Sequence, residues 1–321
     1  MTDLPTRVSD FNALEGLEKP LFLAVGIFDG VHKGHQSVIQ EAVKAAESVD
    51  GVSAVLTFDP HPSRLFRPEA ATELLLPISE KVSLLQDAGI QVVISKQFDA
   101  EFSAIPAENF IAHLKEELPT LAGIFVGSNF RFGKSRLGDV DLLKTTGASE
   151  GILVHSADRL QFEGLAISST RIREDLKSGA IERVNTMLGY RYRFHGTVVA
   201  GQKLGRQLGF PTLNLAWNPE CQPRFGVYLV CLKAKGEAAG SFGIANYGVK
   251  PTVCENSEPL LEVHLLNPTE LDCGSQVEVE WIQFARGEMK FESLEALKAQ
   301  IACDLKWARG VVANGDSYNT V

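Results

Sequence analysis

The sequence is poor in cysteine, in long apolar runs and in basic charge, and each shortage argues against a class of protein. Only 5 of its 321 residues are cysteines, all of them lie between Cys221 and Cys303, and no two have CxxC spacing. We therefore expect neither a zinc site nor a disulfide framework, and reduced thiols fit best. Apolar runs such as 21–27 are far too short to span a bilayer. Met1–Asp10 contains no basic stretch followed by an apolar core, so no signal peptide is evident and we expect a cytoplasmic location.

The charge balance is acidic, with 40 Asp and Glu residues against 31 Lys and Arg residues and a formal net charge of -9 at pH 7. This balance argues against nucleic acid or an anionic membrane as the main partner. A small anionic substrate is still compatible with it, because a local glycine-rich turn or helix N-terminus can outweigh the global charge. We therefore expect small-molecule substrates as partners, and the sequence predicts no particular oligomeric state.

The first half of the chain alternates short apolar runs with amphipathic segments. Apolar runs separated by helical patterns predict a parallel sheet that is covered on both faces. Ligands of such sheets bind at the carboxyl ends of the strands. The predicted strands are 21–27, 52–58, 92–95, 123–126 and 151–154, and the predicted helices are 34–49, 80–88, 107–117 and 139–148.

The pattern changes after Tyr190 to short strand-like runs separated by turn residues, with no long helix between them. This arrangement is typical of a small antiparallel barrel. A closing helix is expected from Ser293, a plausible N-cap, to Ala308. The predicted strands of this half are 192–199, 227–232, 243–246, 260–266 and 277–284.

The fold class is therefore α/β with two domains, as expected for a chain that is long for one compact core. We predict a Rossmann-like domain with a parallel sheet in 1–175 and a small antiparallel β-barrel domain with a C-terminal helix in 191–321. The segment 176–190 is interpreted as a linker that carries short helical stretches.

The turn at 26–36, which reads Gly-Ile-Phe-Asp-Gly-Val-His-Lys-Gly-His-Gln, is the most informative part of the sequence. It follows an apolar run and precedes a helical pattern, so its glycines let backbone N–H groups at a helix N-terminus approach a phosphate. His32 and His35 can donate hydrogen bonds as charge builds on that phosphate during phosphoryl or nucleotidyl transfer. The alternative is an ordinary strand-to-helix turn with two surface histidines. The string resembles the HxGH signature of the nucleotidyltransferases, and its form GxFDGxHxGHQ looks like that of the FAD synthetase branch.

Three more strings belong with this turn. They are Thr-Phe-Asp-Pro-His-Pro at 57–62, Gly-Ser-Asn-Phe-Arg-Phe-Gly at 127–133 and Ser-Ser-Thr-Arg-Ile-Arg at 168–173. Taken alone, the last string could be an N-cap cluster, whereas hydroxyls, amides and an arginine at a helix start also suit a triphosphate. In this order, the four strings resemble the adenylyltransferase module of bacterial bifunctional riboflavin kinase/FAD synthetases over roughly residues 20–175.

The resemblance implies roles for individual residues of this module. According to this resemblance, His32 and His35 are catalytic and contact the ATP phosphates, and Asn129 helps to position the substrate phosphate. Asp29 either touches the nucleotide or only orders the turn. The residues that the resemblance places at the ATP and flavin of this module are Gly26, Phe28, Asp29, Gly30, Asn129, Ser168, Ser169, Thr170 and Arg173.

A second glycine-rich stretch, 201–215, lies in the barrel half, after the predicted strand 192–199. Its glycines would let the backbone wrap a nucleotide, and the Thr212 hydroxyl and the Asn214 amide oxygen are hard ligands suited to Mg²⁺. In isolation, Gly-Phe-Pro-Thr is only a turn that enters a strand. The stretch resembles the flavokinase signature GRxLGFPTxN. The further nucleotide-binding residues that this resemblance implies are Lys203, Gly205 and Arg206.

Glu262, in the string Leu-Glu-Val-His at 261–264, is the expected catalytic partner of that loop. Kinases commonly use a carboxylate to accept the proton of the acceptor hydroxyl. The flavokinase resemblance, over roughly 185–308, implies this role for Glu262 towards the ribityl 5′-hydroxyl, although a strand glutamate is more often simply solvent-facing. The family usually has Arg, Asp and Tyr where this chain has Lys250, Asn267 and Cys273, which puts kinase affinity and rate in doubt more than the reaction.

The expected function is FAD synthesis in two steps: ATP phosphorylates riboflavin to FMN, and a second ATP adenylylates FMN to FAD and pyrophosphate. Both steps should need Mg²⁺, with ATP, riboflavin, FMN and FAD as substrates or products. Two alternatives stay open, an FMN adenylyltransferase whose barrel only binds flavin, and a non-enzymatic sensor of flavin or nucleotide.

Overall fold

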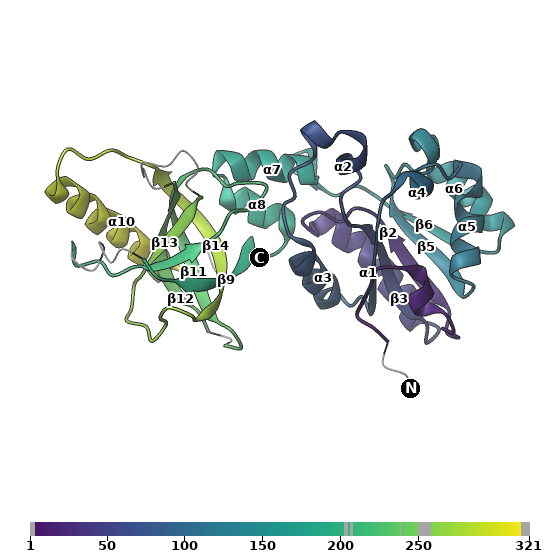
Figure 1. Cartoon of the computed structure of the whole chain (residues 1–321), viewed down its shortest axis with the longest axis horizontal. Helices are drawn as coiled ribbons and strands as arrows, with labels where there is room; N and C mark the ends of the chain where they lie inside the picture. The colour runs from purple at the N-terminus through teal and green to yellow at the C-terminus, as the bar shows by residue number, and fades with distance from the viewer. Residues whose placement is uncertain (1–3, 202–204, 206–207, 238, 250–257, 316–321) are drawn as a thin grey trace. The chain divides into compact units, whose positions relative to one another are not determined.

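The chain folds into two compact units, Met1–Ser169 and Thr170–Val321, in a computed structural model (Figure 1). The residues that the structure describes are 4–201, 205, 208–237, 239–249 and 258–315. No helix in these ranges is both long and apolar enough to cross a membrane.

A six-stranded sheet with only parallel pairings forms the centre of the first unit, as the apolar runs predict. Listed in their order across the sheet, the strands are β1 (Arg7–Val8), β4 (Val92–Lys96), β3 (Val52–Phe58), β2 (Leu21–Val25), β5 (Leu121–Gly127) and β6 (Leu153–Ala157). The edge strand β1 was not predicted, because two residues carry no periodic signal. The last predicted strand lies two to three residues further along the chain, as β6.

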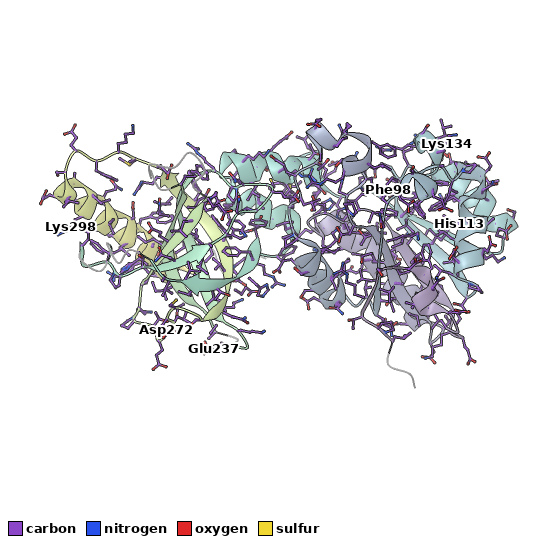
Figure 2. All side chains as sticks on the ribbon, viewed as in Figure 1. Phe98, His113, Lys134, Glu237, Asp272 and Lys298 are labelled. Carbon is purple, nitrogen blue, oxygen red and sulfur yellow. The ribbon has the colours of Figure 1, made fainter. Side chains whose placement is uncertain are left out.

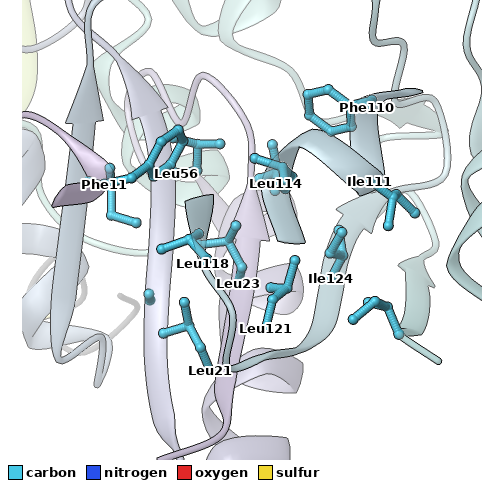
Figure 3. Packing of buried hydrophobic residues seen from close by; sticks show 14 of the residues in the cluster. Phe11, Leu21, Leu23, Leu56, Phe110, Ile111, Leu114, Leu118, Leu121 and Ile124 are labelled. Atoms are coloured by element: carbon cyan, nitrogen blue, oxygen red, sulfur yellow. The ribbon is translucent and has the colours of Figure 1, made fainter. Parts of the chain in front are cut away.

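Helices cover both faces of this sheet. The long helix α1 (Lys33–Glu47) packs against β2, β3 and β5 and buries residues such as Val38 and Ile39. The opposite face forms a separate core with α5 (Phe110–Glu117), in which Leu21 and Leu23 of β2 lie with Phe110 and Leu114 (Figure 3). The remaining helices of at least four residues in this unit are α2 (Ser63–Phe66), α3 (Ile78–Asp87), α4 (Ala100–Ser103) and α6 (Val140–Ser149), together with the 3₁₀ turn Phe11–Leu14. A small hairpin, β7 (Gln161–Phe162) and β8 (Leu165–Ala166), was not predicted.

Two helices precede the barrel and occupy most of the predicted linker. Helix α7 runs Ser169–Ser178 and α8 runs Ile181–Leu188, where Gly189 ends it with a left-handed φ of 79°. The buried side chain of Asn185 fixes α8 to the barrel, because its Nδ2 donates to the Trp281 carbonyl at 2.8 Å and its Oδ1 accepts from the Tyr192 amide at 2.8 Å. Residues 170–190 thus belong to the compact unit that holds the barrel.

The second unit contains a closed barrel of antiparallel strands, as predicted. In spatial order its strands are β10 (Leu213–Ala216), β13 (Leu260–Leu265), β12 (Ser241–Gly248), β11 (Gly226–Ala234), β14 (Gln276–Gly287) and β9 (Arg193–Val199). Strand β10 was not predicted as a strand, because its four residues are too few for a period-2 pattern and follow a glycine-rich loop. It closes the barrel by pairing with both β9 and β13.

The closing helix α10 (Leu294–Asn314) covers part of the barrel's outer face. Leu305 and Ala308 of α10 form one core cluster with Leu229 of β11 and Ile244 of β12, whereas Lys298 is exposed (Figure 2). The prediction that this helix ends at Ala308 is wrong. It continues past Gly310 to Asn314, and Gly315 stops it with a left-handed φ of 67°.

Candidate functional site

The first candidate site lies where the strand order of the parallel sheet reverses. The chain passes from β2 to β3 and then β4 on one side, and it returns to place β5 on the other side of β2. The carboxyl ends of β2 and β5 are therefore neighbours, and a crevice at such a switch point is where open α/β sheets bind ligands. The turn that carries His32 follows β2, and the string that carries Asn129 follows β5.

The turn after β2 has an unusual backbone. Phe28 and Val31 have positive φ values of 52° and 35°, a region that non-glycine residues rarely adopt, and Gly30 has a φ of 79°. Phe28, Asp29 and Val31 are almost completely buried. The Asp29 carboxylate accepts hydrogen bonds from the Leu75 amide at 3.0 and 3.2 Å, which favours a role in ordering the turn over contact with a nucleotide.

His32 and His35 lie together at the start of α1. His32 is the N-cap residue of this helix, and its Nδ1 accepts a hydrogen bond from the His35 amide at 3.3 Å. The two imidazole rings stack with centroids 3.6 Å apart, and the Phe28 ring meets His35 edge-on at 5.3 Å. Since His32 Nδ1 is an acceptor, the proton of the neutral ring is assigned to Nε2, which leaves that nitrogen as a hydrogen-bond donor.

The surroundings of both histidines disfavour their charged forms. Burial lowers the pKa of His32 to about 4; a hydrogen bond from its backbone acts against this shift and the Arg159 charge adds to it. The pKa of His35 is also well below its usual range, first because of burial and then because of His32 and Lys81. His35 Nδ1 is buried and has no hydrogen-bond partner among the described residues. The pair is therefore neutral at pH 7 and can act by donating hydrogen bonds.

Ser169 of the 168–173 string contacts this turn, and Asn129 of the 127–133 string comes just after β5. The hydroxyl of Ser169, the first residue of α7, donates to the Asp29 carbonyl at 2.8 Å, so Ser169 lies at the histidine turn. Ser168 is half-buried, whereas Thr170 is exposed on the first turn of α7 and Arg173 is half-buried further along it. Asn129 is exposed directly after β5, with its Oδ1 above Gly127.

One residue near this site was missed by sequence reasoning. Lys81 of α3 is buried, and its Nζ donates to the Ile27 carbonyl at 3.1 Å, directly before Phe28. The sequence signal is a lysine on the same face of a helix as Leu84 and Leu85, both buried.

The second candidate site lies on the outer face of the barrel. Strand β13 runs between β10 and β12, and Glu262 is directly opposite Asn214 on one side and Asn246 on the other. Residues directly opposite in antiparallel strands point to the same face. Leu261 and Val263, which flank Glu262, are completely buried, so the half-buried Glu262 points outward. Two residues 48 positions apart, Asn214 and Glu262, are thus brought together by strand pairing.

The surroundings of the Asn214 amide oxygen suit the binding of a metal ion. Asn214 is 6% exposed, and its Oδ1 is buried with no hydrogen-bond partner among the described residues. Gly201 lies against this amide so closely that a Cβ there would be 2.2 Å from Asn214 Nδ2. A Cβ at Gly205 would be 3.2 Å from the half-buried Thr212 hydroxyl. A buried amide oxygen without a partner among the described residues is the kind of ligand that a hard cation such as Mg²⁺ prefers. The described residues contain no group of three His, Cys, Asp or Glu side chains that could hold a metal.

His264 joins the loop before β10 to the strand that carries Glu262. Its Nδ1 lies 2.7 Å from the Pro211 carbonyl, so this nitrogen carries the proton and donates, and the ring meets Phe210 edge-on at 5.7 Å. The predicted binding residues Lys203 and Arg206 and the departure at Lys250 lie outside the described residues. Two further departures from the family pattern, Asn267 and Cys273, are exposed.

Comparisons with known proteins identify the family of each half of the chain. The family model for FAD synthetase matches residues 15–171, and the family model for riboflavin kinase matches residues 188–312. The bifunctional riboflavin kinase/FMN adenylyltransferase of Pseudomonas fluorescens is 34% identical over 90% of this chain and 92% of its own. The enzyme of the same name from Escherichia coli (strain K12) is 35% identical over 93% of this chain and 95% of its own.

A solved structure supports the fold over nearly the whole chain. It is a crystal structure described as a macrolide-efflux protein from Streptococcus pneumoniae, with a TM-score of 0.84, 26% identity, and coverage of 94% of this chain and 98% of its own. The two family models and the near-complete coverage of the relatives lead to one conclusion: this chain belongs to the family of bifunctional riboflavin kinase/FMN adenylyltransferases.

Proposed function

We propose that this protein makes FAD from riboflavin in two steps, each carried out by one of two domains. In the first step, the ribityl 5′-hydroxyl oxygen attacks the γ-phosphorus of ATP, and the bond from that phosphorus to the bridging oxygen of ADP breaks. In the second step, an FMN phosphate oxygen attacks the α-phosphorus of another ATP, and pyrophosphate leaves. One observation carries this assignment: the chain has a neutral histidine pair at the switch point of one unit and an amide–carboxylate pair on the barrel of the other.

The histidine turn supports the adenylylation step. His32 can donate a hydrogen bond from Nε2, because its Nδ1 accepts one from the His35 amide. Neutral imidazole N–H groups at a helix N-terminus can stabilise the charge that develops on the phosphates as pyrophosphate leaves. No protein nucleophile is needed, since the enzyme only has to hold the two phosphates in line. In this proposal Asn129, Ser168, Ser169, Thr170 and Arg173 bind the phosphates, and Gly26, Phe28, Asp29 and Gly30 shape the turn.

The barrel site supports the phosphorylation step. Glu262 accepts the proton of the ribityl hydroxyl as its oxygen attacks, which is the usual task of a carboxylate in a kinase. Its place directly opposite Asn214 puts this base next to the proposed ATP loop. Lys203, Gly205 and Arg206 complete that loop in the proposal.

We propose Mg²⁺ as the metal of the barrel site, held by the Thr212 hydroxyl and the Asn214 amide oxygen. When bound with ATP, the ion neutralises charge on the phosphates. Asn214 supplies a buried oxygen that otherwise has no partner among the described residues, which is the main support for this assignment.

The functional limits proposed are 1–175 for the adenylyltransferase domain and 191–321 for the riboflavin kinase domain, with 176–190 as the connector. The partners are small molecules and not nucleic acid, and the place of action is the cytoplasm. The acidic net charge of -9 supports the first point.

A single assay tests the two-step function. The protein is incubated with riboflavin, ATP and Mg²⁺, and the flavins are separated. FAD is expected as the end product, with FMN as an intermediate. FAD that forms only from supplied FMN would leave the barrel as a flavin-binding module, and binding without any turnover would make the protein a sensor.

A further inference from the structure

Lys81 is a buried cation that neither of the two proposed reactions uses. It lies on α3, is 3% exposed, and shares the buried face of that helix with Leu84 and Leu85. A buried ammonium is costly unless it is hydrogen-bonded, so its acceptors show what it stabilises. Both acceptors are neutral oxygens that belong to other elements: the Ile27 carbonyl at 3.1 Å and the Thr57 hydroxyl at 3.4 Å.

The Ile27 carbonyl receives two donors and links three elements. Thr57 at the end of β3 donates its hydroxyl to this carbonyl at 2.9 Å, and Lys81 reaches the same oxygen from α3. Ile27 lies just after β2 and directly before Phe28, the first residue of the turn with positive φ. The ammonium thus holds the backbone at the point where the chain leaves the sheet and enters the strained turn.

That turn needs such support. Positive φ at Phe28 and Val31 costs of order 1–3 kcal/mol each and persists only where the surroundings fix the backbone. The Leu75 amide and the Ser169 hydroxyl hold Asp29 in the middle of the turn. Lys81 and Thr57 hold its beginning, and His32 and His35 follow at its end.

We propose that Lys81 is a positioning residue for FMN adenylylation: through the Ile27 carbonyl it fixes the strained turn that presents His32 and His35 to the phosphates. This inference rests on the function proposed for that turn. The proposed role acts through the hydrogen bonds of Lys81 to Ile27 and Thr57.

The charges around the turn agree with this role. Burial lowers the pKa of Lys81, whereas Asp29 and Asp59 act to raise it and Arg7 acts to lower it. The Lys81 charge in turn lowers the pKa of His35, after the larger effects of burial and of His32. Lys81 therefore also helps to keep His35 neutral.

The test compares Lys81→Met with Lys115→Met in the full-length protein. Lys115 is a matched control, because it also donates to a backbone carbonyl, that of Glu150 at 2.6 Å, but its side chain is 40% exposed. We expect Lys81→Met to lower kcat for FMN adenylylation by about 10–100-fold, the size of loss that a misplaced catalytic group causes. Riboflavin phosphorylation should stay within about twofold in both variants, and Lys115→Met should adenylylate normally.

A pH measurement separates positioning from a general loss of stability. NMR of ¹⁵N-labelled histidine should find His35 neutral at pH 6.5 in the wild-type protein, and its titration should move to higher pH in Lys81→Met. Charged His35 at pH 6.5 in the wild type, or a folded Lys81→Met that adenylylates FMN normally, overturns the inference. If Lys81→Met does not fold, Lys81→Gln replaces it, since its amide nitrogen is one bond too short to reach Ile27; normal activity of that variant overturns the inference equally. Wild-type protein that makes no FAD from FMN removes the proposed function itself, and this inference with it.

Discussion

Glu262 on β13 lies directly opposite Asn214 on β10, and both side chains are on the outer face of the barrel. Their pairing joins a half-buried carboxylate to a buried amide whose oxygen has no hydrogen-bond partner among the described residues. The proposed proton acceptor and the proposed cation ligand thus lie on neighbouring strands of one ladder. Rigid strands hold such groups more accurately than loops do.

Replacement of Glu262 by Gln should disable riboflavin phosphorylation. The amide keeps the size and hydrogen bonding of the side chain but cannot accept a proton, and general-base contributions are typically about 10²–10⁴-fold. We expect kcat for FMN formation to fall by that factor, with little change in the KM for ATP and none in FMN adenylylation. Steady-state kinetics with each substrate measure this. A normal rate of riboflavin phosphorylation would leave Glu262 as a surface strand residue.

Replacement of Asn214 by Ala should raise the Mg²⁺ concentration that the kinase reaction requires and leave adenylylation unchanged. Loss of one oxygen ligand, if it is worth about 1.4 kcal/mol, raises the Mg²⁺ concentration for half-maximal FMN formation roughly tenfold. Asn218→Ala is the control, because Asn218 is exposed and accepts only a surface hydrogen bond from Gln222. An unchanged Mg²⁺ titration for Asn214→Ala would remove Asn214 from the metal site.

Replacement of both His32 and His35 by Ala should abolish conversion of FMN to FAD and leave riboflavin phosphorylation largely intact. The reason is that the histidine pair belongs to the first unit, whereas Glu262 and Asn214 belong to the second. Separation of FMN and FAD after incubation with ATP measures both activities in one sample. Equal loss of both activities in a folded double variant would contradict the assignment of one reaction to each unit.

The first unit should lose stability in mild acid because of His32. The pKa of this residue is lowered to about 4, whereas in the unfolded chain it is near 6.5. Between these values the unfolded chain binds a proton that the folded chain does not, so the free energy of unfolding falls as pH decreases from 6.5 to 4. The shift corresponds to about 3 kcal/mol.

Urea unfolding of the full chain at several pH values between 6.5 and 4.5 measures this loss. His32→Asn is the control, because asparagine also caps a helix N-terminus but does not titrate. The variant should lose less stability than the wild type over this range. Parallel curves for the two proteins would show that His32 is not the titrating group.

A fragment that contains residues 170–321 should be clearly more stable than one that contains 191–321. The shorter fragment lacks α8, whose Ile181 and Val184 are completely buried, and both hydrogen bonds of Asn185 to the barrel. Each buried hydrogen bond contributes about 0.5–1.5 kcal/mol, and each fully buried aliphatic side chain about 1.5–3 kcal/mol. We expect a difference of more than about 5 kcal/mol, measured by urea unfolding. Riboflavin kinase activity should persist in the longer fragment, and equal stability of the two would show that α8 is dispensable.

The sequence by itself determined that the chain has two domains, the order of their main elements and the strings that are proposed to carry the chemistry. Parallel strands such as β3 appear in the sequence as apolar runs, because both faces of the sheet are covered. The buried residues of α1 recur at helical spacing, so this helix could also be predicted. The HxGH string is a local feature that neighbouring residues reveal, whereas Glu262 was assigned mainly through the resemblance of its string to the flavokinase family. Short elements such as β1 and β10 were missed, since two to four residues carry too little pattern.

Only the tertiary structure decided which of these features meet. That β2 lies beside β5 depends on a crossover of the chain, and that Asn214 faces Glu262 depends on the register between β10 and β13. The buried Lys81 likewise contacts Ile27, at the start of the histidine turn, from 54 positions away in the sequence. Such contacts are fixed by the packing of whole elements against one another, and no periodicity within one segment encodes which partner it will find.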